Sequence, residues 1–169
     1  MALTTLDQMF VHELGDIYDA EHRFLDAQQK MVQQADDSTL KRMINDHIGQ
    51  TRLQIANLEQ VFRLLNENAR RETCDSATGL VSEAEKGMKE AADAPPIRDC
   101  LIASAVSKVE HYEIASYRGL IQGAEQMQRK EIVDLLKENL KQEEQTAKLV
   151  ESSTPDLLRK VVKAEQVGR

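Results

Sequence analysis

The sequence predicts an all-α protein built as a bundle of four long helices with a short fifth helix near its C-terminal end. Apolar residues recur at spacings of three and four over several long segments, which is the period of one helix face. Aromatic residues make up only 4% of the 169 residues, with 7 glycines, 3 prolines and no tryptophan, so residues that favour strands or interrupt helices are scarce. This length suits a single domain over residues 1–169.

The first two predicted helices form a hairpin. Phe10, Leu14 and Ile17 lie on one face of the first helix, which we predict over residues 5–34. The polar cluster at 35–38 interrupts this pattern, and Asp37 or Ser38 can accept hydrogen bonds from the exposed amides of a following helix. The apolar pattern then resumes over 38–68. A tight turn therefore joins the first helix to a second one.

The second half of the chain begins with a long connection. Residues 69–95 lose the helical period, apart from a segment at 81–88 that could form a short helix. Pro96 can open a helix, and the apolar pattern that follows predicts a third long helix ending near 123–127. A fourth helix carries Ile132 in its pattern and stops at Ser152-Ser153. Pro155, which follows a capping threonine, then opens a short fifth helix over 155–164.

The lengths of the connections predict how the helices are joined. Short links connect the first helix to the second and the third to the fourth, whereas the link between the second and third is long. This is the connectivity of ferritin-like bundles, in which one crossover joins two antiparallel hairpins. An up-down-up-down bundle with a decorated loop stays open, because the sequence does not say whether the long connection runs the length of the bundle.

Charge and hydropathy argue against several classes of partner. The 22 Lys and Arg residues oppose 29 Asp and Glu residues, which gives a net charge of −7 and no broad basic face for nucleic acid or anionic lipid. The most apolar segment, 101–109, contains two serines and Lys108, so we expect no membrane span. The N-terminal residues lack a basic leader followed by an apolar run, which argues against a secretory signal. Cys74 and Cys100 form no Cys-x-x-Cys pair and are predicted to be free thiols.

Carboxylates on the predicted core face of the helices define a candidate site. Glu21 continues the apolar stripe of the first helix, Glu110 and Glu113 interleave with apolar residues of the third, and Glu143 extends the stripe of the fourth. Counting equal distances from each turn places Glu21 level with Gln50, and it places Glu110 and Glu113 level with Glu143. We therefore expect these side chains to meet near the middle of the bundle.

A buried cluster of this kind requires cations, protons or local solvent, because burying an ionised carboxylate costs several kcal/mol. Hard oxygen ligands suit iron, manganese or magnesium, and the Glu-x-x-Glu spacing puts Glu110 and Glu113 on one helix face. His47 lies about one turn from Gln50 and could be a nitrogen ligand, a donor to a ligand or a hydrogen-bonded core histidine. The competing interpretation is that ordinary ion pairs neutralise the acids, with Arg23, Arg52, Lys108 and Lys141 as the cations.

Three runs of sequence carry a resemblance to a known family. They are FVHELGDIYDAE at 10–21, HIGQTRLQ at 47–54 and KVEHYEIASY at 108–117. Through these runs the chain resembles the YciE/YciF-like bacterial stress proteins, a branch of the ferritin-like superfamily. The resemblance implies a four-helix bundle with a fifth helix, a cytoplasmic homodimer, a dinuclear iron or manganese site and a role in the stress response.

The chain departs from the family pattern on its second and fourth helices. Related sequences usually carry acids where this chain has Gly49 and Gln50, and the Glu-x-x-His motif of ferritin-like di-iron sites is missing on both helices. Our leading hypothesis is that the site holds one or two iron or manganese ions and performs redox chemistry with oxygen or peroxide. The alternative is a non-enzymatic helical dimer that retains a degenerate metal site and acts through a protein partner. The residues expected to bind metal are Glu21, His47, Gln50, Glu110, Glu113 and Glu143.

Overall fold

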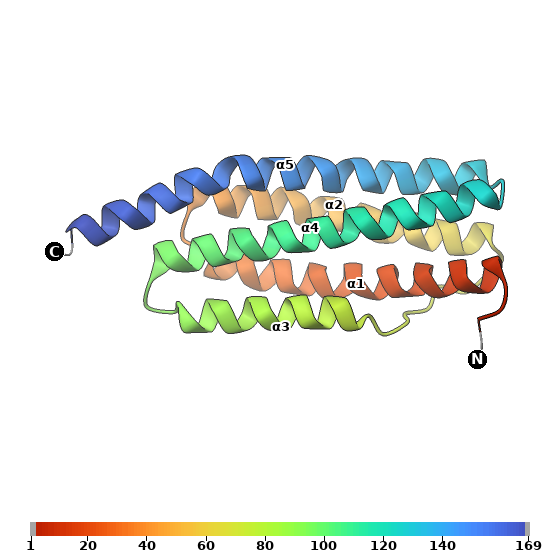
Figure 1. Ribbon diagram of the computed structural model, residues 1–169, viewed down its shortest axis with the longest axis horizontal. Helices are drawn as coiled ribbons and strands as arrows, with labels where there is room; N and C mark the ends of the chain where they lie inside the picture. Colours follow the sequence, from red (N-terminus) through yellow and green to blue (C-terminus); the bar gives the residue numbers. More distant parts are fainter. Residues whose placement is uncertain (1–2, 168–169) are drawn as a thin grey trace.

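The computed structural model describes residues 3–167, which form five helices and no strand (Figure 1). Four long helices make up the bundle, and a shorter one packs against two of them. The all-α fold class is therefore confirmed. The helices are α1 (Leu6–Gln34), α2 (Ser38–Leu64), α3 (Asp75–Glu90), α4 (Pro95–Gln126) and α5 (Lys130–Val167).

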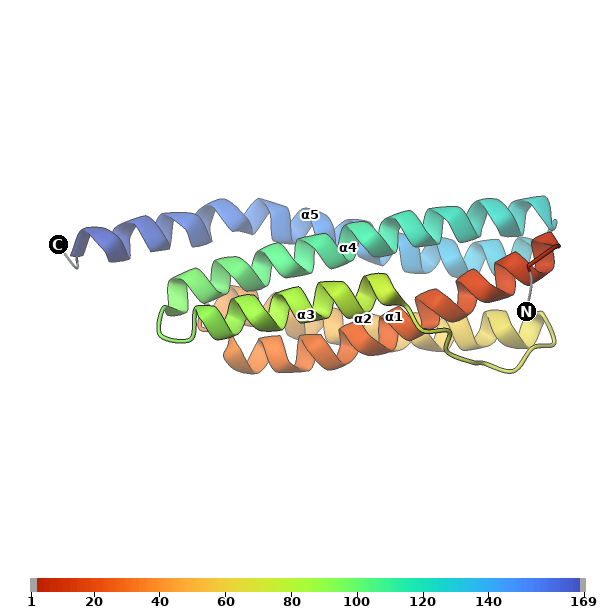
Figure 2. The same cartoon turned by 60° about the horizontal axis from the view of Figure 1, so that its bottom comes forward.

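The order and direction of the helices are those of a ferritin-like bundle. Helices α1 and α2 form one antiparallel hairpin and α4 and α5 form the other, while α2 packs against α5 and α1 against α4. The connection that contains α3 runs back along the bundle, so α2 and α4 point in the same direction (Figures 1 and 2). This parallel pair excludes the up-down-up-down arrangement that the sequence left open.

The turn between α1 and α2 is held by two aspartates. The carboxylate of Asp37 accepts hydrogen bonds from the backbone N–H groups of Thr39 and Leu40, which confirms its predicted role as the N-cap of α2. Asp99, near the start of α4, accepts hydrogen bonds at 2.7 and 2.8 Å from the backbone N–H groups of Asp36 and Asp37. The start of the second hairpin thereby fixes the turn of the first.

Helix α3 is longer than the short helix predicted at 81–88. It begins directly after Cys74, whose sulfur accepts a hydrogen bond from the backbone N–H of Ala77 at 3.3 Å. The backbone N–H of Cys74 donates to the Asp19 carboxylate of α1 at 3.0 Å. The sequence did not indicate this start, because cysteine is an uncommon cap and its partner Asp19 is distant in the chain.

The predicted end of the fourth helix at Ser152-Ser153 is wrong, and so is the separate fifth helix at 155–164. Helix α5 continues through Pro155 to Val167. The hydroxyls of Ser152, Ser153 and Thr154 donate to backbone carbonyls three or four residues earlier, at 2.8 to 2.9 Å, which is compatible with a continuous helix. Pro155 removes one internal hydrogen bond and its ring crowds the carbonyl of the preceding turn, and α5 bends toward its C-terminal end, as Figure 1 shows.

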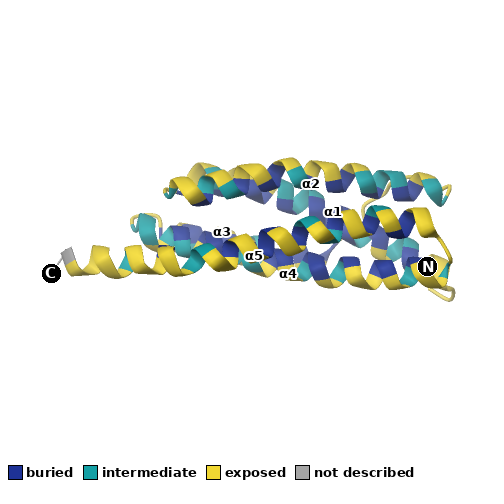
Figure 3. Cartoon of the chain, turned by 90° about the horizontal axis from the view of Figure 1, so that it is seen from above, coloured by how far each residue is buried: buried dark blue, intermediate teal, exposed yellow. Residues whose placement is uncertain are grey.

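The C-terminal part of α5 is anchored to the α1–α2 turn. Leu157 is buried in the core cluster around α2, and Lys160 forms an ion pair with Asp37. Beyond this anchor the helix projects past the bundle, and Figure 3 shows that its surface there is mostly exposed. Tertiary contacts therefore outweigh the local signals that normally end a helix at Thr154-Pro155.

Gly15 lets the crossover pass close over α1. Its carbonyl accepts a hydrogen bond from the Glu72 N–H at 3.1 Å, and a Cβ atom at this position would lie 2.7 Å from Glu72 Cγ and 3.2 Å from the Arg70 carbonyl oxygen. We expect Gly15→Ala to lower the free energy of unfolding by about 1 to 2 kcal/mol in urea denaturation, because the connection must shift. Gly49→Ala is the matched control. It meets open space, so a gain of about 0.5 to 1 kcal/mol is expected, and equal effects at both sites would contradict this view.

The apolar core consists of two clusters with buried polar residues between them. One cluster centres on Phe10, Phe24 and Phe62, and the other on Met31, Leu40 and Ile102. The polar layer draws residues from all four long helices, and its acids, its histidine and its amides are each under 5% exposed. The candidate site occupies this layer, whose members are Glu21, Gln28, His47, Thr51, Gln54, Glu110, Glu113, Asn139, Glu143 and Thr146.

Candidate metal centre

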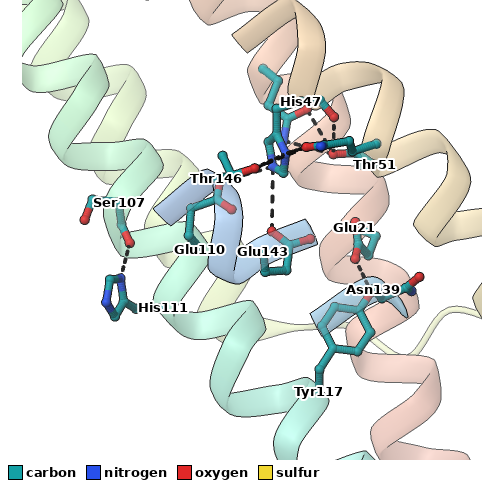
Figure 4. Close-up of polar contacts among 12 residues, drawn as sticks. Glu21, His47, Thr51, Ser107, Glu110, His111, Tyr117, Asn139, Glu143 and Thr146 are labelled. Atoms are coloured by element: carbon teal, nitrogen blue, oxygen red, sulfur yellow. Dashed lines mark hydrogen bonds and ion pairs between the residues drawn. The ribbon is translucent and has the colours of Figure 1, made fainter. Parts of the chain in front are cut away.

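Five candidate ligands meet inside the bundle. Glu21 comes from α1, His47 from α2, Glu110 and Glu113 from α4, and Glu143 from α5, and all are at most 2% exposed. Four of them, excluding Glu21, each offer a ligand atom within 4.8 Å of the others. Figure 4 shows Glu110, Glu143 and His47 turned toward one another in the interior.

His47 links the carboxylates to a second set of polar side chains. Its Nε2 atom lies 3.1 Å from Glu110 Oε1 and 3.8 Å from Glu143 Oε2. Its Nδ1 atom lies 3.1 Å from Gln50 Oε1 and 3.2 Å from the Thr146 hydroxyl oxygen. A neutral His47 with its proton on Nδ1 can donate to either oxygen, and it then presents the lone pair of Nε2 to a cation among the carboxylates.

The carboxylates lack the hydrogen bonds that normally stabilise buried charge. Seven oxygens accept no hydrogen bond and are shielded from solvent: both oxygens of Glu110, Glu113 and Glu143, and Oε2 of Glu21. His47 Nε2 approaches two of them only at the ion-pair distances given above. Unpaired buried carboxylates are strongly destabilising when ionised, so this arrangement calls for protons or a bound cation.

Burial raises the pKa of every acid in the cluster. The pKa of Glu110 rises to about 7, with burial as the largest cause. Burial also raises the pKa values of Glu21 and Glu113 well above the usual range, and the negative charge of Glu143 adds to both effects. The pKa of Glu143 rises well above its usual range, because of burial and then because of contact with Glu110. These shifts show that the cluster resists holding several negative charges without a cation.

The cations considered as ordinary ion-pair partners lie elsewhere. Arg23 pairs with Asp19 at 2.5 Å, and Lys108 pairs with Glu83 on the surface at 2.5 Å. Arg52 and Lys141 are exposed. The competing interpretation, in which these arginines and lysines neutralise the cluster, therefore has no support in the geometry.

Gln50 is the candidate ligand that the structure does not bring to the carboxylates. Its Oε1 atom accepts a hydrogen bond from the Thr146 hydroxyl at 3.1 Å and lies against His47 Nδ1, on the opposite side of the imidazole ring from the acids. The prediction placed Gln50 level with Glu21. In the structure the next residue, Thr51, contacts Gln28, which lies two helical turns beyond Glu21 on α1. This shift arises because the extended residues at the turn displace α2 along the bundle axis.

Several polar residues around the cluster were missed from the sequence. Gln54 is fully buried, Tyr117 is fully buried with its hydroxyl donating to Glu21 Oε1, and Asn139 is fully buried beside Tyr117. Each lies four or seven residues from a predicted ligand on the same helix, so helical spacing alone could have found them. They were missed because they lie in helical stripes whose other residues are mostly apolar, as in an ordinary hydrophobic core.

Topology and buried chemistry together define the class of protein. This is a helical bundle of ferritin-like connectivity whose interior holds a carboxylate–histidine cluster. Residues 5–163 match the family described as "Domain of unknown function (DUF892)", and the chain belongs to this family. The resemblance inferred from the sequence is thereby confirmed.

Individual relatives agree with the family assignment. The chain is 34% identical to protein YciF of Escherichia coli K12 over 147 residues, which cover 86% of this chain and 88% of that protein. The crystal structure of the E. coli stress protein YciF matches with a TM-score of 0.88 at 31% identity, covering 94% and 99% of the two chains. YcfI of Rhodopseudomonas palustris matches with a TM-score of 0.85 at 34% identity, covering 88% and 94%.

Hydropathy adds one further finding about the fold. Within residues 3–167, no helix contains an apolar stretch that is long enough, and poor enough in charged residues, to cross a membrane.

Proposed function

We propose that the carboxylate–histidine cluster binds one or two divalent ions of iron or manganese. The observation that carries this proposal is the set of seven interior carboxylate oxygens without a hydrogen bond, lying beside His47 Nε2. A divalent cation would neutralise the repulsion among them and satisfy their lone pairs. Removing such a cation should leave the cluster protonated or strained.

The donor set favours iron or manganese. Carboxylate oxygens with a single imidazole nitrogen match the preference of these ions, whereas thiolates, which favour softer ions, are absent from the cluster of described residues. His47, Glu110, Glu113 and Glu143 would hold one ion, since their ligand atoms lie together. Glu21 supplies a further carboxylate for a second ion. A bound redox-active ion would supply electron transfer to oxygen or peroxide.

The relatives support a proposal for the biological role. YciF of E. coli is described as a stress protein, and we propose a stress-response role for this chain as well. We also propose that it is a cytoplasmic homodimer, as the family resemblance implies. Light scattering after size-exclusion chromatography tests the dimer, whose mass should be twice the 19.1 kDa of one chain. A monomeric mass would contradict it.

The proposed redox function can be tested with a pair of adjacent glutamates. Glu143 is buried in the cluster, whereas Glu144 is exposed and pairs with Arg118 at 2.7 Å. The protein is first loaded with Fe(II) in the absence of oxygen. When oxygen or peroxide is then added, the bound iron should be oxidised, and the rate is measured by absorbance. We expect Glu143→Gln to slow this reaction at least tenfold and Glu144→Gln to leave it within twofold. Equal rates in both variants would contradict a role for the cluster.

A second candidate function has specific support. Helix α2 contributes one histidine, one threonine and one glutamine to the polar layer, without a carboxylate, so the site is poorer in acids than the di-iron pattern. In addition, Leu158 and Val162 lie one turn apart on the C-terminal part of α5 and are about half exposed, at 52% and 53%. Apolar surface of this kind suits a protein partner. A wild-type protein that binds no metal would favour this function.

A further inference from the structure

A second layer of buried polar side chains lies against Glu21. The hydroxyl of Tyr117 hydrogen-bonds to Glu21 Oε1, and the Asn139 side-chain nitrogen lies 3.1 Å from the Tyr117 oxygen (Figure 4). Both Tyr117 and Asn139 are fully buried. The other oxygen of the same carboxylate, Glu21 Oε2, is buried and has no hydrogen-bond partner. One oxygen of Glu21 is therefore engaged, while the other remains available.

A backbone carbonyl determines the direction of these hydrogen bonds. The Asn139 nitrogen lies 3.2 Å from the carbonyl oxygen of Gln54, and a carbonyl can only accept, so this end of Asn139 is its NH₂ group. Asn57 agrees with this orientation, because its own amide donates to Asn139 Oδ1 at 2.8 Å. The second N–H of Asn139 therefore donates to the Tyr117 oxygen. The Tyr117 hydroxyl therefore donates its own proton to Glu21 Oε1.

Asn139 also ties the Tyr117 oxygen to the backbone of α2. The Gln54 carbonyl and the Tyr117 oxygen both lie within hydrogen-bonding distance of the same Asn139 nitrogen. Without Asn139, the Tyr117 oxygen would lose the buried donor that holds it in place. Its hydroxyl would then be positioned by Glu21 alone, and the geometry of that hydrogen bond would be less well fixed.

We propose that Asn139 is a positioning residue of the metal centre. By donating to Tyr117 and to the Gln54 carbonyl, it holds Tyr117 as the donor to Glu21 Oε1 and leaves Glu21 Oε2 as the ligand atom. This inference rests on the proposed metal-binding function, and it explains why two fully buried polar side chains stand behind a carboxylate. Partners of this kind orient ligands and tune their affinity for a metal.

A double-mutant cycle tests this coupling. Mn(II) binding is measured by electron paramagnetic resonance for wild type, Asn139→Leu, Tyr117→Phe and the double variant. Each single variant should weaken Mn(II) binding about tenfold. The double variant should bind as Tyr117→Phe alone does, because Asn139 acts through a hydroxyl that is already missing. Asn139→Leu binding as tightly as wild type, or losses that multiply in the double variant, would overturn the proposal.

Nuclear magnetic resonance separates this proposal from the metal-binding function. The ¹³Cδ signal of Glu21 is measured in protein without metal and is assigned with Glu21→Gln. Its chemical shift should change in both single variants. It should have the same value in Tyr117→Phe and in the double variant. If wild type binds no Mn(II), the proposed function fails, yet the hydrogen-bond arrangement is still judged from these signals. A Glu21 signal that is unchanged in Asn139→Leu would overturn the arrangement itself.

Discussion

Replacing Glu110 with Gln is expected to abolish tight metal binding and, in the absence of metal, to stabilise the fold at pH 7. Burial raises the pKa of Glu110 from 4.5 to about 7, so the folded protein holds this group at a cost near neutral pH. By thermodynamic linkage, Glu110→Gln should raise the free energy of unfolding by about 1 to 3 kcal/mol. This range includes the opposing cost of burying the new amide. Urea denaturation of protein without metal measures it.

A surface acid serves as the control for Glu110. Glu83 on α3 pairs with Lys108 of α4 at 2.5 Å and is largely exposed, so Glu83→Gln should change the free energy of unfolding by less than about 1 kcal/mol and leave metal binding unchanged. A large loss of stability in Glu110→Gln would contradict our account. It would mean that the carboxylate is a structural ion-pair partner of His47 rather than a strained ligand.

The stability of the protein without metal should fall as pH rises from about 4.5 to 7. For an acid whose pKa is higher in the folded state, the folded protein binds more protons than the unfolded one between the two pKa values. Raising the pH through this window therefore destabilises the fold. Glu110, with its pKa moved from 4.5 to about 7, accounts for about 2 kcal/mol over this range. Thermal unfolding at a series of pH values measures the slope.

The opposite trend should appear below about pH 4. Burial alone would raise the pKa of Asp19, but hydrogen bonds from Arg23, from the backbone of Cys74 and from Arg71 together outweigh burial and lower this pKa. This carboxylate stabilises the fold above its unfolded pKa and loses that contribution as pH falls through its lower folded pKa. Bound metal should remove the loss of stability at high pH, because it takes the place of the protons. A metal-free protein that is most stable at pH 8 would contradict the strained cluster.

Most of the fold could be predicted because helical periodicity is a local property. The stripes that contain Phe10, Leu14 and Ile17 give the helix and its buried face together, and the long connection before Pro96 gives the crossover. The end of α5 could not be predicted in this way. Thr154-Pro155 is a sound local signal for a new helix, but the contact of Lys160 with Asp37 depends on a turn more than 100 residues away.

The site was predictable where the register between helices was regular. Glu110 and Glu143 meet as counting from the α4–α5 turn predicts, because both contact His47. Counting failed across the α1–α2 turn, where Ala35 and Asp37 are extended and shift α2 along the axis. Extended residues advance the chain about twice as far as helical ones, so a few of them displace the register by a turn or more.

The most direct test of the central claim is the metal content of the protein. Wild type is loaded with Fe(II) or Mn(II) without oxygen, desalted and analysed by elemental mass spectrometry, beside Glu110→Ala and Glu113→Ala. Our account predicts one or two tightly held ions per wild-type chain and their loss in both variants, with the fold retained. A correctly folded wild type that keeps no metal would contradict it.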